Sequence, residues 1–182
     1  MNRRKKTAVL GATLLLTAAA AGSAAASGAG AGDHHRREAA ALTGTAKLYR
    51  SAGDDITFSF DAHLAAKHND NPLRATGTFE WSHYAEGRGA WAKAKVNCLV
   101  TGGKVAVVSG VITDSDLPGA KGKQVGVTVH DIGRHDRLGY SWAATGTPVE
   151  TGSMPKCVSS APYEKVKQGT GDYKVVPWQP KL

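Results

Sequence analysis

The amino-acid sequence predicts an all-β fold, a single antiparallel meander of seven or eight strands. Apolar and polar side chains alternate through most of residues 42–182, which is the period of a strand with one buried face. The spacing typical of an amphipathic helix is almost absent there, and the segments between the alternating runs are short and rich in turn residues. Consecutive strands joined by short turns lie side by side and run in opposite directions.

The first 26 residues are typical of a secretory signal peptide. Four basic residues at positions 3–6 precede an apolar run over 8–21, which is shorter than the roughly 20 residues that a transmembrane helix needs. Small residues at Ala24 and Ala26 predict cleavage before Ser27. The sequence therefore predicts a secreted, extracellular protein with no membrane span after cleavage.

The mature chain carries only a mild positive charge. Four of the 23 Lys and Arg residues leave with the signal peptide and all 15 Asp and Glu residues remain, so 19 basic against 15 acidic side chains give +4. Such an excess makes no strong case for a nucleic-acid partner. Residues 27–41 are rich in glycine and alanine without periodicity, so we expect a flexible arm before a single domain over 42–182.

The expected strands differ in how many of their faces are apolar. Most alternate strictly, so one face meets the core and the other meets water. Residues 105–112 are apolar on both faces, which predicts a central or covered strand. The segment 148–168 hardly alternates and contains Pro155 and Pro162, so we expect a long connection there, with a short helix over 163–167. The expected strands are 42–48, 56–62, 75–82, 90–100, 105–112, 125–129, 138–142 and 173–176.

A meander of this length either rolls into a barrel or folds over into two packed sheets. Rolling removes exposed strand edges, so we favour the barrel over the two-sheet sandwich. Cys98 and Cys157 predict one disulfide, because a cysteine pair in an exported protein is normally oxidised. Cys98 is in phase with the apolar side of its strand, so the disulfide is expected to meet the core.

Four short runs of the domain have a distinctive sequence. They are DITFSFDAH at 55–63, GTF and WSHY within 77–84, CLVTGG at 98–103 and DRLGY at 136–140. They resemble small secreted proteins of high-GC Gram-positive bacteria that are labelled repetin-like. The resemblance covers the chain from about residue 42 onward, and it implies no reaction, ligand or catalytic residue.

The strand over 90–100 carries the candidate binding site. Trp91, Lys93 and Lys95 are two residues apart, so they form one row on the polar face in steps of about 7 Å. An exposed indole stacks on a sugar or a base, while ammonium groups attract phosphate or uronate. We therefore predict a non-catalytic binding module for the cell wall or another extracellular polymer. The alternative is that Trp91 covers a barrel end and the lysines are only solvated.

A second hypothesis is a metal-dependent or hydrolytic enzyme. His130, Asp131, His135 and Asp136 flank the turn after the sixth expected strand, and imidazole and carboxylate groups bind divalent transition metals. Against a metal site, both residue types are ordinary in turns, and His130 and Asp131 face opposite sides of a continuous strand. No other cofactor is predicted.

Catalytic residues are not predicted by any motif. The sequence has no G-x-S-x-G elbow, and the S-x-x-K match at Ser153 contains Pro155, which disfavours the helix that this motif needs. A third hypothesis is protease inhibition or another protein-interaction role, for which the segment 114–123 would serve as an exposed rigid loop.

Overall fold

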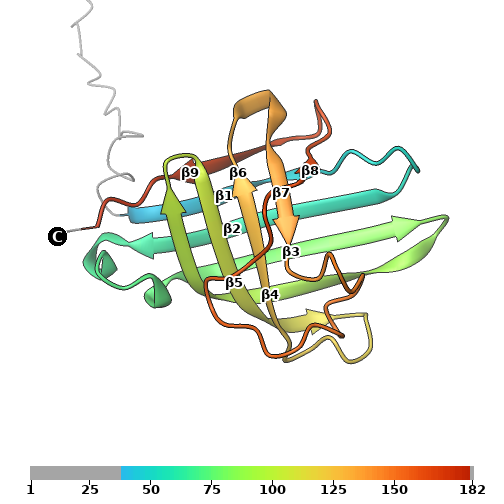
Figure 1. The fold of residues 1–182 in the computed structure, drawn as a ribbon, viewed down its shortest axis with the longest axis horizontal. Helices are drawn as coiled ribbons and strands as arrows, with labels where there is room; N and C mark the ends of the chain where they lie inside the picture. The colour runs from blue at the N-terminus through green and yellow to red at the C-terminus, as the bar shows by residue number, and fades with distance from the viewer. Residues whose placement is uncertain (1–37, 181–182) are drawn as a thin grey trace, which may run out of the picture.

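The computed structural model describes residues 38–180, which form one antiparallel sheet of nine strands. The sheet curls into a half-barrel, with β5, β6 and β7 crossing in front of β1, β2 and β3 (Figure 1). The predicted all-β meander with one disulfide is confirmed. These residues form no α-helix, and none of their helical turns is long and apolar enough to cross a membrane.

The strand order follows the chain from β1 to β8, and β9 returns to pair with the free side of β1. Short 3-10 turns lie between β2 and β3 and between β6 and β7. The strands are β1 (Glu38–Lys47), β2 (Asp55–Ala65), β3 (Thr76–Ala85), β4 (Arg88–Gly102), β5 (Val105–Ser115), β6 (Gln124–His130), β7 (Arg137–Tyr140), β8 (Glu164–Lys165) and β9 (Asp172–Val176).

Two segments have another structure than the sequence predicts. β1 begins at Glu38, so residues 38–41 belong to the sheet and not to the predicted arm. The short helix expected over 163–167 is wrong, because β8 occupies this place. The Lys165 carbonyl accepts a hydrogen bond from the Tyr49 amide, and the Lys167 amide donates to the Lys47 carbonyl, so this segment pairs with the end of β1. The predicted signal peptide and residues 27–37 lie outside the described residues.

Aromatic side chains fill the inside of the half-barrel. Phe58 and Phe60 on β2 and Phe79 and Trp81 on β3 are buried, with neighbouring ring centres 6.0 to 6.3 Å apart. Tyr173 on β9 meets Phe60 edge to face, with ring centres 5.3 Å apart. Full burial of one such side chain contributes roughly 1.5–3 kcal/mol, so this cluster is a major source of stability.

A β-bulge in β4 changes the face to which Cys98 belongs. The register of β4 against β5 shifts between Val96 and Cys98, and Cys98 then lies opposite Ser109. Ala94 and Val96 belong to the core, whereas Cys98 is buried on the outer face of the sheet. The expectation that the disulfide meets the core is therefore wrong, because an extra residue in one strand inverts the alternation beyond it.

The long connection between β7 and β8 covers this outer face. Its backbone crosses β6 and β7 so closely that a Cβ atom on Gly126 would lie 2.0 Å from the Val158 carbonyl oxygen, and one on Gly139 1.9 Å from that of Ala161. Cys157 ties the connection to β4, with a Cα–Cα distance of 5.4 Å. The connection explains why the strand predicted over 105–112 is apolar on both faces.

Candidate functional site

The predicted row of Trp91, Lys93 and Lys95 lies on the outer face of β4. The three residues alternate with the buried Ala92 and Ala94, so the sequence prediction of a shared polar face is confirmed by their burial pattern. The indole of Trp91 is 36% exposed, which leaves part of one ring available to a ligand.

The backbone of Trp91 is fixed where β5 ends. Its amide donates to the Asp116 carboxylate over 2.7 Å, and its carbonyl accepts a hydrogen bond of 2.7 Å from the Ser115 hydroxyl. The pairing of β4 with β5 ends at Ala92, so on this side the two side chains bind the backbone groups of Trp91 that a strand would otherwise bind. Trp91 is therefore held at the edge of the ladder by specific hydrogen bonds.

Hydroxyl groups surround Trp91 on the same face. Thr57, Ser82 and Trp91 lie in register across β2, β3 and β4, and neighbouring strands are about 4.8 Å apart. The next row begins with Thr45 and Ser59, whose hydroxyl oxygens are 2.6 Å apart. Together they border a shallow groove of about 340 Å³, here called the outer groove, lined by Thr45, Thr57, Ser59, Glu80, Ser82 and Trp91 with Trp81 beneath.

The outer groove is close to electrically neutral. The Lys93 ammonium lies 3.8 Å from the Glu80 carboxylate in the neighbouring strand. On its other side Lys93 faces Asp114, whose pKa is lowered mainly by a hydrogen bond from Lys121, so this carboxyl is ionised at neutral pH. Acidic residues thus offset the charge of Lys93, whereas Lys95 lies opposite Thr78 and Val111.

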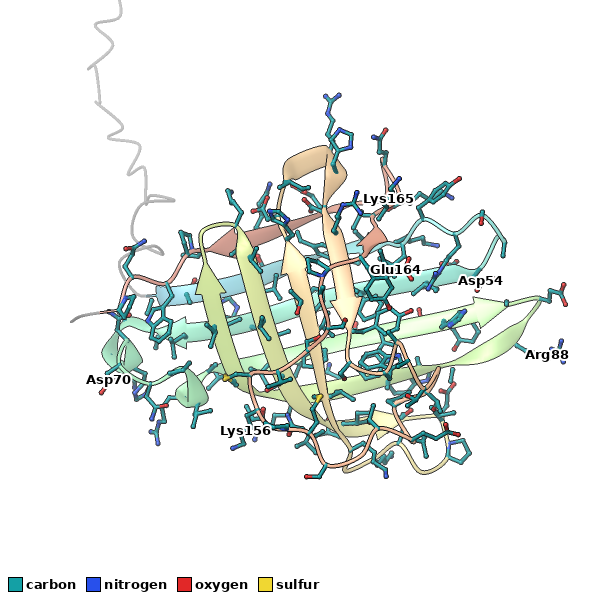
Figure 2. All side chains as sticks on the ribbon, in the orientation of Figure 1. Asp54, Asp70, Arg88, Lys156, Glu164 and Lys165 are labelled. Atoms are coloured by element: carbon teal, nitrogen blue, oxygen red, sulfur yellow. A yellow bond between two sulfur atoms is a disulfide. The ribbon has the colours of Figure 1, made fainter. Side chains whose placement is uncertain are left out.

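A second recess opens on the inner face of the same strands. A cavity of about 350 Å³, here called the inner cavity, lies between β2, β3, β4, the end of β7 and the segment after it. Figure 2 labels Asp54 and Arg88 at the end of the sheet where this cavity lies. The residues lining it are Ile56, Phe58, Trp81, His83, Gly89, Ala90, Trp91, Ala92, Leu117, Tyr140, Trp142, Gly146, Thr147 and Pro148.

The candidate metal ligands lie apart from both recesses, and their carboxylates are engaged with β9. The Tyr173 amide donates to Asp136 Oδ2 over 2.9 Å, and the Val175 amide donates to Asp131 Oδ2 over 3.1 Å. These amides belong to the side of β9 that no strand covers. The two carboxylates therefore satisfy an otherwise open strand edge inside the seam of the half-barrel.

The remaining groups of this turn do not complete a metal site. Asp131 and Asp136 are buried, whereas His135 is exposed and His130 is partly exposed. Asp136 also accepts a 2.8 Å hydrogen bond from the Ile132 amide. Within residues 38–180, no group of three or more His, Cys, Asp or Glu side chains is placed to hold a metal ion.

Burial and hydrogen bonding shift two carboxyl pKa values in opposite directions at this seam. Burial raises the pKa of Asp136 and outweighs its hydrogen bonds from the Tyr173 and Ile132 amides. A hydrogen bond from Lys174 lowers the pKa of Asp172, which also contacts Asp136. Asp136 is thus the carboxyl that holds its proton more readily in the folded protein.

The segment 114–123, predicted as an exposed rigid loop, is anchored at its centre. Ala120 is fully buried, and Leu117 packs against the core. The Gly122 amide donates to the Ile112 carbonyl over 2.8 Å, which draws the loop back onto β5. The loop is therefore fixed to the core at Leu117 and Ala120, while Asp114, Asp116, Pro118, Gly119, Lys121 and Gly122 are exposed, so protease inhibition stays a prediction.

Sequence reasoning missed the inner cavity and the hydroxyl rows beside Trp91. The alternation of apolar and polar residues assigns Trp81 and Trp142 to the buried face of the sheet. It does not reveal which side chains of that face meet when the sheet curls. The hydroxyl rows had a signal in the sequence, since Thr57, Ser59 and Ser82 occupy the polar phase of their strands. No family model, curated protein or solved structure matches this chain, so the resemblance to repetin-like proteins remains a prediction.

Proposed function

We propose that this protein is an exported, non-catalytic binding protein that holds a neutral, hydroxyl-rich polymer, such as a cell-wall polysaccharide, in its outer groove. The observation that carries the proposal is the partly exposed Trp91 indole beside rows of hydroxyl groups on the outer face of the sheet. The fixed backbone of Trp91 supports it, because a pre-positioned ring loses less conformational entropy on binding.

The chemistry of the groove matches that of a sugar chain. A sugar ring presents C–H groups that pack on an aromatic face and hydroxyl groups that both donate and accept hydrogen bonds. The indole of Trp91 offers the first contact. The hydroxyls of Thr57 and Ser82 and the carboxylate of Glu80 offer the second, since hydroxyls donate and accept and a carboxylate accepts.

The charge of the groove favours a neutral polymer over a polyanion. Lys93 lies between Glu80 and Asp114, so its positive potential is reduced. A polyanion site needs several cations whose bound counterions are released on binding. The groove also lacks the large apolar patch that a stable protein partner requires.

Export is part of the proposal and is supported by two features. The layout of residues 1–26 is typical of a signal peptide. The Cys98–Cys157 disulfide supports the same placement, because structural disulfides persist in oxidising compartments and are rare in the cytosol.

Replacing Trp91 by alanine should weaken polymer binding roughly tenfold, since loss of one stacking ring costs about 1–3 kcal/mol. The measurement is co-sedimentation of purified protein with insoluble peptidoglycan, chitin and cellulose. The matched control is Tyr49→Ala, which removes an aromatic ring that is 58% exposed and lies outside the groove.

The control should sediment like the unmodified protein, and raised salt should change binding little. If the unmodified protein sediments with none of the three polymers, the proposed function is wrong. Equal loss of binding in Trp91→Ala and Tyr49→Ala would show that the outer groove is not the site.

A further inference from the structure

The inner cavity is bounded by a layered group of aromatic rings. Trp142 lies 4.6 Å from Trp81 and 4.9 Å from Tyr140, measured between ring centres. Phe58 lies 6.0 Å from Tyr140 and 6.3 Å from Trp81, with interplanar angles of 21° and 15°. Offset stacks of this spacing are the preferred arrangement of aromatic groups, and a ring-shaped ligand can extend them.

The cavity exists because β4 supplies small side chains opposite these large ones. Gly89, Ala90 and Ala92 line its wall, while the neighbouring strand β3 contributes Trp81. A well-packed interior leaves few voids larger than a water molecule. Alanine at two alternate positions of one strand, facing tryptophan and tyrosine, therefore leaves a shaped space instead of a filled core.

The size of the cavity fits a molecule with two fused rings. Its volume is about 350 Å³. An apolar cavity of about 150 Å³ in another protein stays dry and accommodates benzene. Functional ligand pockets commonly begin at about 300 Å³ and are lined mainly by apolar and aromatic residues.

The lining restricts the charge of the occupant. Among the described residues that border the cavity, none is Lys, Arg, Asp or Glu. An anionic group would lose its hydration there without gaining a Lys or Arg partner, which costs several kcal/mol. The cavity therefore selects against anions.

One oriented polar group lies at the rim of the cavity. His83 Nε2 is 2.9 Å from Asp54 Oδ2, and because a carboxylate only accepts, the imidazole nitrogen donates this hydrogen bond. In the neutral ring the other nitrogen, Nδ1, is then left as an acceptor. A hydroxyl group on the ligand is the complementary donor.

We infer that the inner cavity is a second binding site for an uncharged planar molecule of one or two rings that carries a hydroxyl group. It is distinct from the outer groove, although Trp81 and Trp91 border both. The rings insert between Trp142, Tyr140 and the alanine side of β4. The hydroxyl group lies at the rim, within reach of His83.

The inference is tested by calorimetric titration of the purified protein with 1-naphthol. The matched probes are 1-naphthalenesulfonate, which has the same rings and a charge, and 1-decanol, which has a hydroxyl group and no ring. We expect 1-naphthol to bind at least about tenfold more tightly than either probe, a free-energy difference of about 1.4 kcal/mol.

Cavity-filling variants locate the site. Ala92→Leu and Ala90→Leu each place a larger side chain in the space, so 1-naphthol affinity should fall at least about tenfold. Each variant should melt at or above the temperature of the unmodified protein, because the added atoms fill a void. Lys93→Ala, on the outer face of the same strand, should bind 1-naphthol unchanged.

Three results would overturn the inference. The first is 1-naphthol binding no tighter than 1-naphthalenesulfonate or 1-decanol. The second is a lower melting temperature in both leucine variants, which would show that the space is already filled. The third is 1-naphthol affinity that falls in Lys93→Ala as much as in Ala92→Leu. Polysaccharide sedimentation affects none of these readouts, so the two proposals fail separately.

Discussion

Replacing Cys98 and Cys157 together by serine should lower the free energy of unfolding by about 4 kcal/mol. The disulfide joins residues 59 positions apart, so it restricts a long loop of the unfolded chain. It also fixes the long connection against β4, where the Cys157 amide donates to the Ser109 hydroxyl over 2.9 Å.

Urea denaturation of the oxidised protein and of the double-serine variant measures this difference. Ser109→Ala is the control, since it keeps the disulfide and removes the two hydrogen bonds of the Ser109 hydroxyl, which accepts from the Cys157 amide and donates to Asn97. We expect the control to lose about 1–3 kcal/mol, less than the double-serine variant. A double-serine variant within about 1 kcal/mol of the unmodified protein would contradict the stapling role.

Asp136→Asn should destabilise the fold by about 2–3 kcal/mol, because one buried amide then loses its acceptor. The two oxygens of Asp136 accept hydrogen bonds from the Ile132 and Tyr173 amides. Asparagine keeps one acceptor oxygen and presents an NH₂ group to the other amide. Asp131→Asn should act in the same direction, since Asp131 accepts from the Val175 amide.

Asp61→Asn is the matched control, because its side chain is 76% exposed. Its unfolding free energy should stay within about 0.5 kcal/mol of the unmodified value. Chemical denaturation followed by tryptophan fluorescence gives these numbers. Asp136→Asn as stable as Asp61→Asn would show that the carboxylate does not close the seam.

Asp136→Asn also changes how the free energy of unfolding depends on pH. Because the pKa of Asp136 is raised by burial, its folded form binds a proton more readily than the unfolded chain does. Its contribution to stability is therefore full below the ordinary carboxyl pKa and declines as pH rises through the raised value. Asp136→Asn should remove this decline, while Asp172, whose pKa is lowered, keeps the opposite dependence.

The course of the sheet is predictable from sequence because alternation reports burial directly. Phe58 and Phe60 on β2 share a phase that only a half-buried strand explains. β8 was not predictable in this way, since two residues are too few to show a period. β8 pairs with β7, and this segment also meets the residues after β1 through the Leu48–Val166 bridge, which depends on the curl of the whole sheet.

The side on which Cys98 lies shows where alternation stops being reliable. Ala94, Val96 and Cys98 share a phase in the sequence, but the bulge before Cys98 inverts it. No residue pattern in the sequence marks the bulge, because it is set by the pairing of β4 with β5. The disulfide was predictable from the cysteine count, whereas its face was not.

The acidic residues of the β6–β7 turn show a similar limit. Asp131 and Asp136 have the chemistry of metal ligands and equally that of hydrogen-bond acceptors for an open strand edge. The edge belongs to β9, which returns from far along the chain to lie beside β1. Because this contact is between residues far apart in the sequence, the sequence alone does not distinguish a metal ligand from a hydrogen-bond acceptor at these positions.

A nitrogen-15 NMR titration with a soluble chitin oligosaccharide, which carries no charge, measures whether the outer groove binds a neutral polysaccharide through Trp91. We expect shifts of the Trp91 indole N–H and of the backbone amides of Thr57, Ser82 and Lys93. An oligosaccharide that shifts no amide of the outer groove, or shifts only residues of the inner cavity such as Trp142, would contradict polysaccharide binding at Trp91.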